Sequence, residues 1–210
     1  MSPELIETIL VTGTRDMPLL GRHLVRLASS AQDLGYRCDE MLVETQVRAA
    51  AQALREAGPH RLRLLLERNG QCTIQTAPLL PLPLVQEILI APEPLDASEP
   101  LLRYKTTHRP WYTQTIEWLP SHPHIFDLVY LNQRGELCEG SRSNVYVKKN
   151  GRWYTPPVES GCLPGVQRAA LLEAGEAHER VLSAHDLREA EAIRLSNALR
   201  GWFDVVLRDA

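Results

Sequence analysis

The sequence lacks the patterns typical of metal-binding and redox proteins. Its four cysteines form no CxxC pair, and no histidine stands near any of them at the spacing of a metal ligand. Structural zinc sites and redox dithiols need such short spacings. We therefore expect no metal site and four reduced thiols, most of them buried.

A basic cluster and a long apolar run are also lacking. Lysine and arginine number 23 against 26 acidic residues, the net charge is −3, and the basic residues are scattered. Such a chain has no field that attracts nucleic acid or anionic lipid. No apolar stretch approaches the roughly 18 residues of a membrane span, and the first eight residues carry no basic signal-peptide region. We expect a cytoplasmic protein with no nucleic-acid or membrane partner.

The sequence does contain enough apolar material for a substantial core. At 210 residues and 44% hydrophobic content, with no internal repeat, it suffices for one large domain or two small ones. Prolines gather between residues 78 and 100 around one apolar run, 85–91, which we interpret as an isolated strand followed by an extended connector. We place the domain boundary between residues 98 and 99.

The N-terminal half has helix and hairpin signals. Residues 5–11 are apolar and β-forming, 20–34 show helical spacing that stops at Gly35, and Asp39 is a suitable N-cap for a helix reaching residue 57. Alternating leucines follow, and then Asn69-Gly70, a strong hairpin signal. This half is predicted to be mixed α/β, with a β-ribbon over 61–76.

The C-terminal half is predicted to be rich in strands. Pro110 suits the first turn of a helix that ends near residue 118, and strands are expected over 126–131, 144–148, 193–196 and 202–207. Asn150-Gly151 predicts a second hairpin. Helices are expected over 169–174 and from residue 183 or 186. The fold class is therefore α+β, with mixed α/β elements.

One turn can be identified as a candidate anion site. Leu163-Pro164-Gly165 leads into a helix, so the first helical amides, those of Val166 and Gln167, have no partner within that helix. They lie at the positive end of the helix dipole, which favours phosphate. The alternative is a turn that merely starts a helix. Arg26 could add a contact to the same phosphate, or could be a solvated charge on its helix.

Lys105 and Glu139 are candidates for cofactor chemistry. Arg103 and Arg109 flank Lys105, and neighbouring cations lower the pKa of an amine toward the range of a nucleophile. Together with a phosphate site, a lysine and a carboxylate are what a pyridoxal-phosphate enzyme requires. The alternatives are a surface lysine and an exposed carboxylate at the end of a strand.

Six motifs in this order resemble the class IV pyridoxal-phosphate aminotransferases, with the fold of branched-chain and D-amino-acid transaminases. They are Glu7-Thr8, His23-x-x-Arg26-Leu27 with Ser30-Ala31 and Leu34-Gly35, Lys105-Thr106-Thr107, Glu139-Gly140-Ser141-Arg142-Ser143-Asn144, Leu163-Pro164-Gly165, and Ser196-Asn197-Ala198-Leu199-Arg200-Gly201. The Lys105 and Asn197 motifs most resemble those of 4-amino-4-deoxychorismate lyases, including those fused to para-aminobenzoate synthase. The resemblance spans nearly the whole chain.

The resemblance assigns roles residue by residue. It implies that Lys105 forms the Schiff base and that Glu139 binds the pyridine nitrogen. The implied phosphate and ring contacts are Arg26, Leu163, Val166, Gln167, Asn197 and Ala198. Cationic side chains should meet the substrate carboxylates, with His108, Arg109, Arg142 and Arg200 as candidates. Longer members carry a further segment with a Gly-Asp-Gly loop before the first strand, so the resemblance assigns no residues there.

The implied function is lyase chemistry in folate biosynthesis. The products would be para-aminobenzoate and pyruvate, and the cofactor would lie at the junction of domains 1–98 and 99–210. Two alternatives stay open: a transaminase for branched-chain or D-amino acids, and a non-catalytic protein that binds pyridoxal phosphate. The family resemblance also implies a homodimer with a small-molecule substrate.

Overall fold

The protein folds as two compact units in a computed structural model that describes residues 3–83 and 85–208. The first unit contains the chain up to Pro81 together with Tyr104–His108, and the second contains Leu82–Arg103 and the chain from Arg109 onward. The division therefore differs from the predicted boundary at 98/99, and Lys105 belongs to the first unit. The reason is pairing between segments that are distant in sequence. The Ile6 amide donates to the Lys105 carbonyl at 2.7 Å, and the Ala91 amide donates to the Val129 carbonyl at 2.8 Å.

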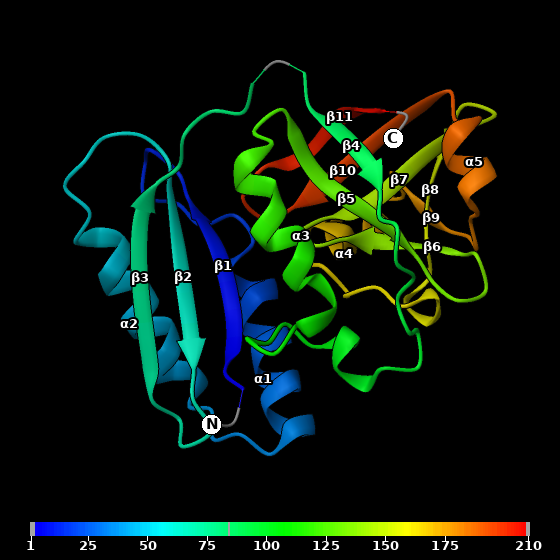
Figure 1. Ribbon diagram of the computed structural model, residues 1–210. Helices are drawn as coiled ribbons and strands as arrows, with labels where there is room; N and C mark the ends of the chain where they lie inside the picture. The colour runs from blue at the N-terminus through cyan, green and yellow to red at the C-terminus, as the bar shows by residue number, and fades with distance from the viewer. Residues whose placement is uncertain (1–2, 84, 209–210) are drawn as a thin grey trace. The chain divides into compact units, whose positions relative to one another are not determined.

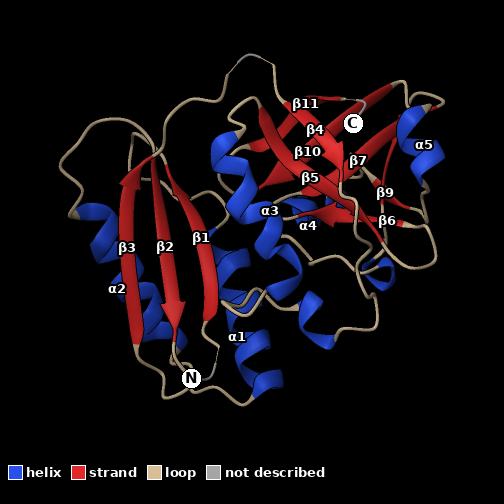
Figure 2. Ribbon diagram, viewed as in Figure 1, coloured by secondary structure: helices blue, strands red, loops and turns tan. Residues whose placement is uncertain are grey.

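The first unit is a three-stranded antiparallel sheet with helices on one face (Figure 1, Figure 2). Its elements are β1 (Leu5–Val11), α1 (Leu20–Leu34), α2 (Glu40–Gln52), β2 (His60–Leu66) and β3 (Cys72–Pro78), with strand order β1-β2-β3. Gly35 ends α1 in the left-handed region at φ 70°, as the sequence predicts. The predicted hairpin at Asn69-Gly70 is confirmed by the pairing of β2 with β3.

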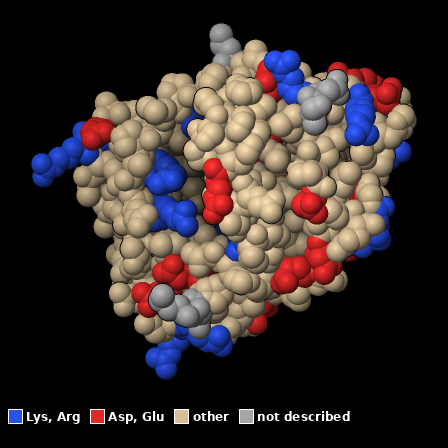
Figure 3. All heavy atoms as spheres, viewed as in Figure 1, with Lys and Arg blue, Asp and Glu red and all other residues tan. Residues whose placement is uncertain are grey.

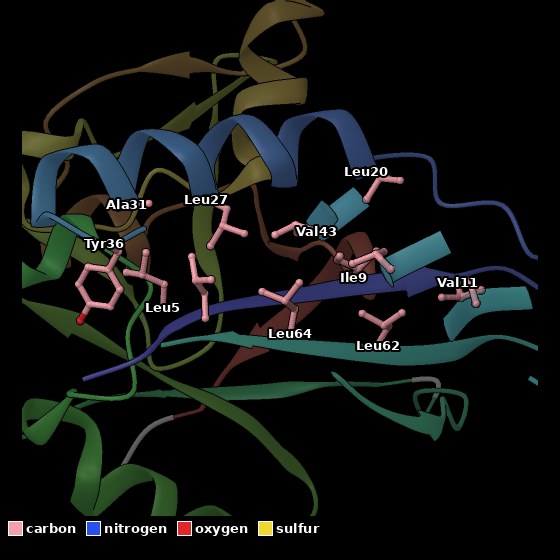
Figure 4. Packing of buried hydrophobic residues seen from close by; sticks show 13 residues of the cluster. Leu5, Ile9, Val11, Leu20, Leu27, Ala31, Tyr36, Val43, Leu62 and Leu64 are labelled. Atoms are coloured by element: carbon pink, nitrogen blue, oxygen red, sulfur yellow. The ribbon is translucent and has the colours of Figure 1, made fainter. Parts of the chain in front are cut away.

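The core of this unit lies between α1, α2 and one face of the sheet. Figure 4 shows Leu27 of α1 and Val43 of α2 packed toward Ile9 and Leu64. Because side chains alternate along a strand, the residues of β1 that face the helices are Leu5, Glu7, Ile9 and Val11, all buried. A carboxylate therefore occupies a position where the pattern calls for an apolar side chain.

The second unit is built on one mixed sheet with strand order β6-β5-β4-β11-β10-β7-β8-β9. The strands are β4 (Glu87–Ile90), β5 (Ile125–Leu131), β6 (Leu137–Gly140), β7 (Asn144–Lys149), β8 (Arg152–Thr155), β9 (His178–Glu179), β10 (Ala192–Asn197) and β11 (Gly201–Leu207). The helices are α3 (Thr113–Trp118), α4 (Val166–Glu173) and α5 (Ala184–Arg188), with short 3₁₀ turns at Pro100–Arg103, Pro110–Tyr112, Leu119–Ser121 and Val158–Ser160. Strands dominate this unit, as predicted.

Three sequence predictions need correction. The run 85–91 is not isolated, because β4 pairs in parallel with both β5 and β11, whose residues lie far along the chain. The helix capped by Asp39, whose side chain accepts from the Leu42 amide at 3.0 Å, ends at Gln52 and not at residue 57. Helix α4 begins at Val166, directly after Gly165, and not at residue 169.

On the face shown in Figure 3, acidic and basic side chains both lie among uncharged ones. Among the described residues, no helix is both long and apolar enough to cross a membrane. All four cysteines are free thiols, as predicted. Cys138 and Cys162 are buried, whereas Cys38 and Cys72 are half-buried.

Candidate active site

Glu139 is a buried carboxylate near the end of β6. Its side chain accepts a hydrogen bond from the Tyr112 hydroxyl at 2.8 Å through Oε1 and one from Asn144 Nδ2 at 3.3 Å through Oε2. The residue is 5% exposed. Burial raises the pKa of Tyr112, and the Glu139 charge adds to this, so the phenol stays a donor. A buried, hydrogen-bonded carboxylate of this kind suits a protonated ring nitrogen.

Asn144, the first residue of β7, connects Glu139 to the turn before α4. Its Nδ2 also donates to the Leu163 carbonyl at 2.9 Å. A Cβ atom on Gly165 would lie 2.1 Å from Asn144 Oδ1, so only glycine permits this approach. Leu163 and the start of α4 are thereby held in a defined position relative to the Glu139 carboxylate.

The N-terminus of α4 has the geometry expected for an anion site. Gly165 occupies the N-cap position and has no side chain to bind the first amides. The first intrahelical bond runs from the Ala169 amide to the Gly165 carbonyl at 2.8 Å, so the amides of Val166 and Gln167 have no partner within the helix. These are the two amides identified in the sequence.

The Asn197 loop lies beside the same turn. Strand β10 pairs with β7 so that Ser196 stands opposite Asn144. Asn197 Oδ1 accepts from the amides of Leu199 and Arg200 at 3.1 and 3.0 Å, and Nδ2 donates to the Arg142 carbonyl at 3.3 Å. Five of the predicted cofactor residues in the second unit therefore lie in the turn before α4, at the start of α4, or at the end of β10 and just after it. They are Leu163, Val166, Gln167, Asn197 and Ala198.

Asp127, on β5, organises the segment between Glu139 and Asn144. Its side chain is fully buried. Oδ1 accepts from the amide and hydroxyl of Ser141 at 3.0 and 2.7 Å, and Oδ2 accepts from the Arg142 amide at 3.1 Å and the Ser143 hydroxyl at 2.6 Å. Burial raises the pKa of Asp127, and the two serine hydroxyls oppose that rise.

The predicted substrate-binding cations have partners in the fold. Arg142 donates through Nε to the Phe126 carbonyl at 3.0 Å, and its guanidinium lies 4.5 Å from the centre of that ring. Arg109 donates to the Ser141 carbonyl at 3.1 Å. Burial, and next the charge of Arg142, lower the pKa of half-buried Arg200. Arg142 thus belongs to the segment 140–143 that Asp127 holds, Arg109 contacts that segment, and Arg200 lies near Arg142. His108 is exposed in the first unit.

Lys105 and Arg26 belong to the first unit, so their action together with Glu139 stays a prediction. Lys105 is half-buried, and its main chain continues the sheet edge, since Leu5 forms an antiparallel bridge with Thr106. Arg26 is not a solvated helix charge. It donates to Glu7 through Nε at 2.9 Å and through Nη2 at 2.5 Å.

Sequence reasoning missed Tyr112 and Asp127, and it quoted Glu7 and Asn144 only within motifs. Asp127 carried a usable signal, because it interrupts an otherwise apolar strand. Tyr112 had none. Among the described residues, no group of three or more His, Cys, Asp and Glu side chains is arranged to hold a metal ion.

Comparisons with known proteins give matches over nearly the whole chain. The family model described as "Amino-transferase class IV" matches residues 4–207. A Schizosaccharomyces pombe protein named "Putative aminodeoxychorismate lyase" is 32% identical over 203 residues, which are 93% of this chain and 86% of that protein. A structure of a "Putative amino-acid aminotransferase" from Mesorhizobium loti is 36% identical at a TM-score of 0.90, over 99% of this chain and 100% of that chain.

A third relative shares the fold. The PLP-bound form of "A hypothetical aminotransferase from Mycobacterium tuberculosis" has a TM-score of 0.80 at 23% identity, over 97% of this chain and 81% of that chain.

Proposed function

Because this chain belongs to the class IV aminotransferases, we propose that it is a pyridoxal-phosphate enzyme that cleaves 4-amino-4-deoxychorismate to para-aminobenzoate and pyruvate. The family depends on pyridoxal phosphate. The observation that carries the lyase assignment is the similarity to the S. pombe protein over 93% of this chain. The buried Glu139 and the unpartnered amides at the start of α4 support the cofactor assignment, because they suit a protonated ring nitrogen and a phosphate.

The proposed cofactor contacts come from both units. Glu139 would accept a hydrogen bond from the ring nitrogen and keep it protonated, while Leu163 would cover one face of the ring. The phosphate would meet the amides of Val166 and Gln167, the loop at Asn197-Ala198 and the guanidinium of Arg26. Lys105 would hold the cofactor aldehyde.

The proposed chemistry needs one base that also acts as an acid. When bound, pyridoxal phosphate supplies a protonated ring that accepts electrons from the substrate. Lys105 takes the proton from the ring carbon that bears the amine and returns a proton to the departing enolpyruvyl group, which leaves as pyruvate. Glu139 maintains the ring charge throughout. The ring product becomes aromatic, so the reaction needs no second substrate.

Substrate recognition is assigned to cations near the segment 140–143, which Asp127 holds. The substrate carries two carboxylates. Arg142 lies in this segment, Arg109 contacts it, and Arg200 lies near Arg142. Arginine suits paired contacts to carboxylate oxygens. His108, in the first unit, is a further candidate. We also propose a homodimer, which light scattering after gel filtration would test.

A transaminase is the alternative that a specific observation favours. The M. loti relative, 36% identical over 99% of this chain, is named an amino-acid aminotransferase. The same cofactor residues would serve both reactions, so the two differ in their substrate and in their need for a keto acid.

The two functions differ in whether each catalytic cycle regenerates the cofactor aldehyde without a second substrate. Lyase chemistry regenerates the aldehyde in every cycle, whereas a transaminase retains the amine and stalls until a keto acid removes it. We would supply chorismate, glutamine and an aminodeoxychorismate synthase without any keto acid. We expect equal amounts of para-aminobenzoate and pyruvate through many turnovers. Bleaching of the yellow protein by common L- or D-amino acids, with recovery on keto-acid addition, would support the transaminase instead.

A further inference from the structure

A buried charged cluster lies in the helix-facing core of the first unit. Glu7 of β1 accepts from Arg26 at 2.9 Å on Oε1 and at 2.5 Å on Oε2, and Oε2 also lies 2.6 Å from His23 Nδ1. The exposed side-chain fractions are 3% for Glu7, 1% for His23 and 13% for Arg26. His23 and Arg26 stand three residues apart on α1, so both reach the strand from one helix face.

Stability alone does not account for this cluster, because burying its charges costs hydration free energy. An ionised carboxylate beside Leu5 and Ile9 loses its hydration, and well-packed apolar side chains often match or exceed the stability of buried ion pairs. The charge of Arg26 and the hydrogen bond from His23 nevertheless overcome desolvation and lower the pKa of Glu7 to about 2. The carboxylate is therefore ionised at neutral pH.

The geometry defines the orientation of the Arg26 guanidinium. Its Nε and Nη2 atoms share one edge of the planar group, and both donate to Glu7. A fork-to-carboxylate pair of this kind constrains the plane of the guanidinium as well as its position. Glu7 lies on the helix-facing side of β1, and β1 is paired with β2. The position of Arg26 is therefore determined by the sheet.

His23 is a second partner of the Glu7 carboxylate, at the oxygen that also accepts from Arg26 Nη2. Its ring is buried, Nδ1 contacts Glu7 Oε2, and Nε2 has no hydrogen-bond partner among the described residues. A buried imidazole nitrogen without a partner lowers stability. This contact keeps the Glu7 carboxylate from turning away from Arg26, which gives the ring a role in orientation.

We propose that Glu7 and His23 are positioning residues that orient Arg26 for the phosphate of the cofactor. The inference rests on the proposed function, because it takes Arg26 as a phosphate contact. Neither Glu7 nor His23 would touch the cofactor. Their effect would pass through the guanidinium alone, so it should depend on the phosphate and not on the ring.

The test compares pyridoxal phosphate with pyridoxal. Both ligands carry the same aldehyde ring, so the ratio of their dissociation constants isolates the phosphate. In Glu7→Gln the amide nitrogen must replace one oxygen that accepts from Arg26, and the charge is lost. We expect pyridoxal phosphate to bind about tenfold more weakly, equivalent to about 1.4 kcal/mol, while pyridoxal binding stays within about twofold of the wild type. Dissociation constants come from absorbance titration of the cofactor-free protein.

Variants of His23 and a matched core variant complete the test. His23→Asn retains a nitrogen donor close to the position of Nδ1, so it should keep the phosphate preference that His23→Leu loses. Ile9→Val removes a methylene from the same face of β1, two residues from Glu7, and should leave the preference unchanged.

The outcomes are distinct. Equal weakening of both ligands in folded Glu7→Gln, or full phosphate preference in His23→Leu, would overturn the inference while leaving the proposed function intact. A wild-type protein that binds no pyridoxal phosphate would refute both. If Glu7→Gln does not fold, the contrast between His23→Asn and His23→Leu decides the question.

Discussion

Substitution of Asp127 tests whether a carboxylate holds the segment between Glu139 and Asn144. Its two oxygens accept from the amides of Ser141 and Arg142, from the hydroxyls of Ser141 and Ser143, and from the Leu128 amide at 3.0 Å. A Cβ on Gly140 would lie 2.3 Å from Asp127 Oδ2, so the segment is packed directly against the carboxylate.

The loss of unfolding free energy depends on which hydrogen-bond donors can find another partner when Asp127 is replaced. Asp127→Ala leaves three main-chain amides, those of Leu128, Ser141 and Arg142, without their side-chain acceptor. At roughly 1–3 kcal/mol each, roughly 3–9 kcal/mol of unfolding free energy should be lost. Asp127→Asn keeps one accepting oxygen. Its NH₂ group can donate to a serine hydroxyl that turns to accept, but a main-chain amide cannot turn. One amide is then unsatisfied, at a cost of roughly 1–3 kcal/mol.

Urea unfolding of the two variants gives the measurement. We expect stability in the order wild type, Asp127→Asn, Asp127→Ala, with the asparagine variant closer to the wild type than to the alanine variant. Asp204→Asn is the control, because Asp204 is an exposed ion-pair partner in the same unit and should change stability by less than about 1 kcal/mol. If Asp127→Asn matches the wild type, or if both variants lose the same amount, the hydrogen-bond account is wrong.

Three further predictions concern the cofactor and pH. Borohydride treatment of the yellow protein should attach label to Lys105, and Lys105→Ala should lack turnover; label on another lysine would exclude the assignment. Glu139→Gln should bind cofactor but lose at least about tenfold in turnover, because it cannot keep the ring protonated as well. The pKa values of Glu7, Glu136 and Asp186 are each lowered to about 2, so the stability they contribute is complete above about pH 4.5 and is lost toward pH 2. The melting temperature should fall across that window, and by less in Glu7→Gln.

The elements that the sequence predicted correctly are those with local causes. The 20–34 helix ends at Gly35 because glycine adopts the left-handed conformation without a Cβ penalty. The hairpin at Asn150-Gly151 forms because both residues accept positive φ, here 51° and 72°. The turn before α4 could also be found locally, because a Pro-Gly pair marks a turn and here leads into a helix. With it came the amides of Val166 and Gln167.

The features that were missed depend on partners distant in sequence. Strand β4 is short and flanked by prolines, so it looks isolated until β11 supplies its neighbour. Asp127 and Glu139 are separated in sequence, and only the pairing of β5 with β6 brings the Asp127 carboxylate under the loop that Glu139 begins. The unit boundary was misplaced for the same reason, because Lys105 pairs back to β1.

The Glu7 cluster separates stability from function in a way that can be measured. The ion pair contributes charge-assisted bonds, but desolvation of the carboxylate and guanidinium offsets much of that gain. Replacing only Arg26 by alanine would leave the Glu7 charge buried with His23 alone, so unfolding free energy should fall by roughly 3–5 kcal/mol. Replacing Glu7, His23 and Arg26 together by leucine, leucine and methionine removes every charge of this cluster and keeps a similar side-chain volume. If the cluster exists to orient Arg26, that triple variant should unfold near the wild-type urea midpoint and yet bind pyridoxal phosphate no better, relative to pyridoxal, than Arg26→Ala does. A triple variant with full phosphate preference would show that Arg26 does not meet the phosphate.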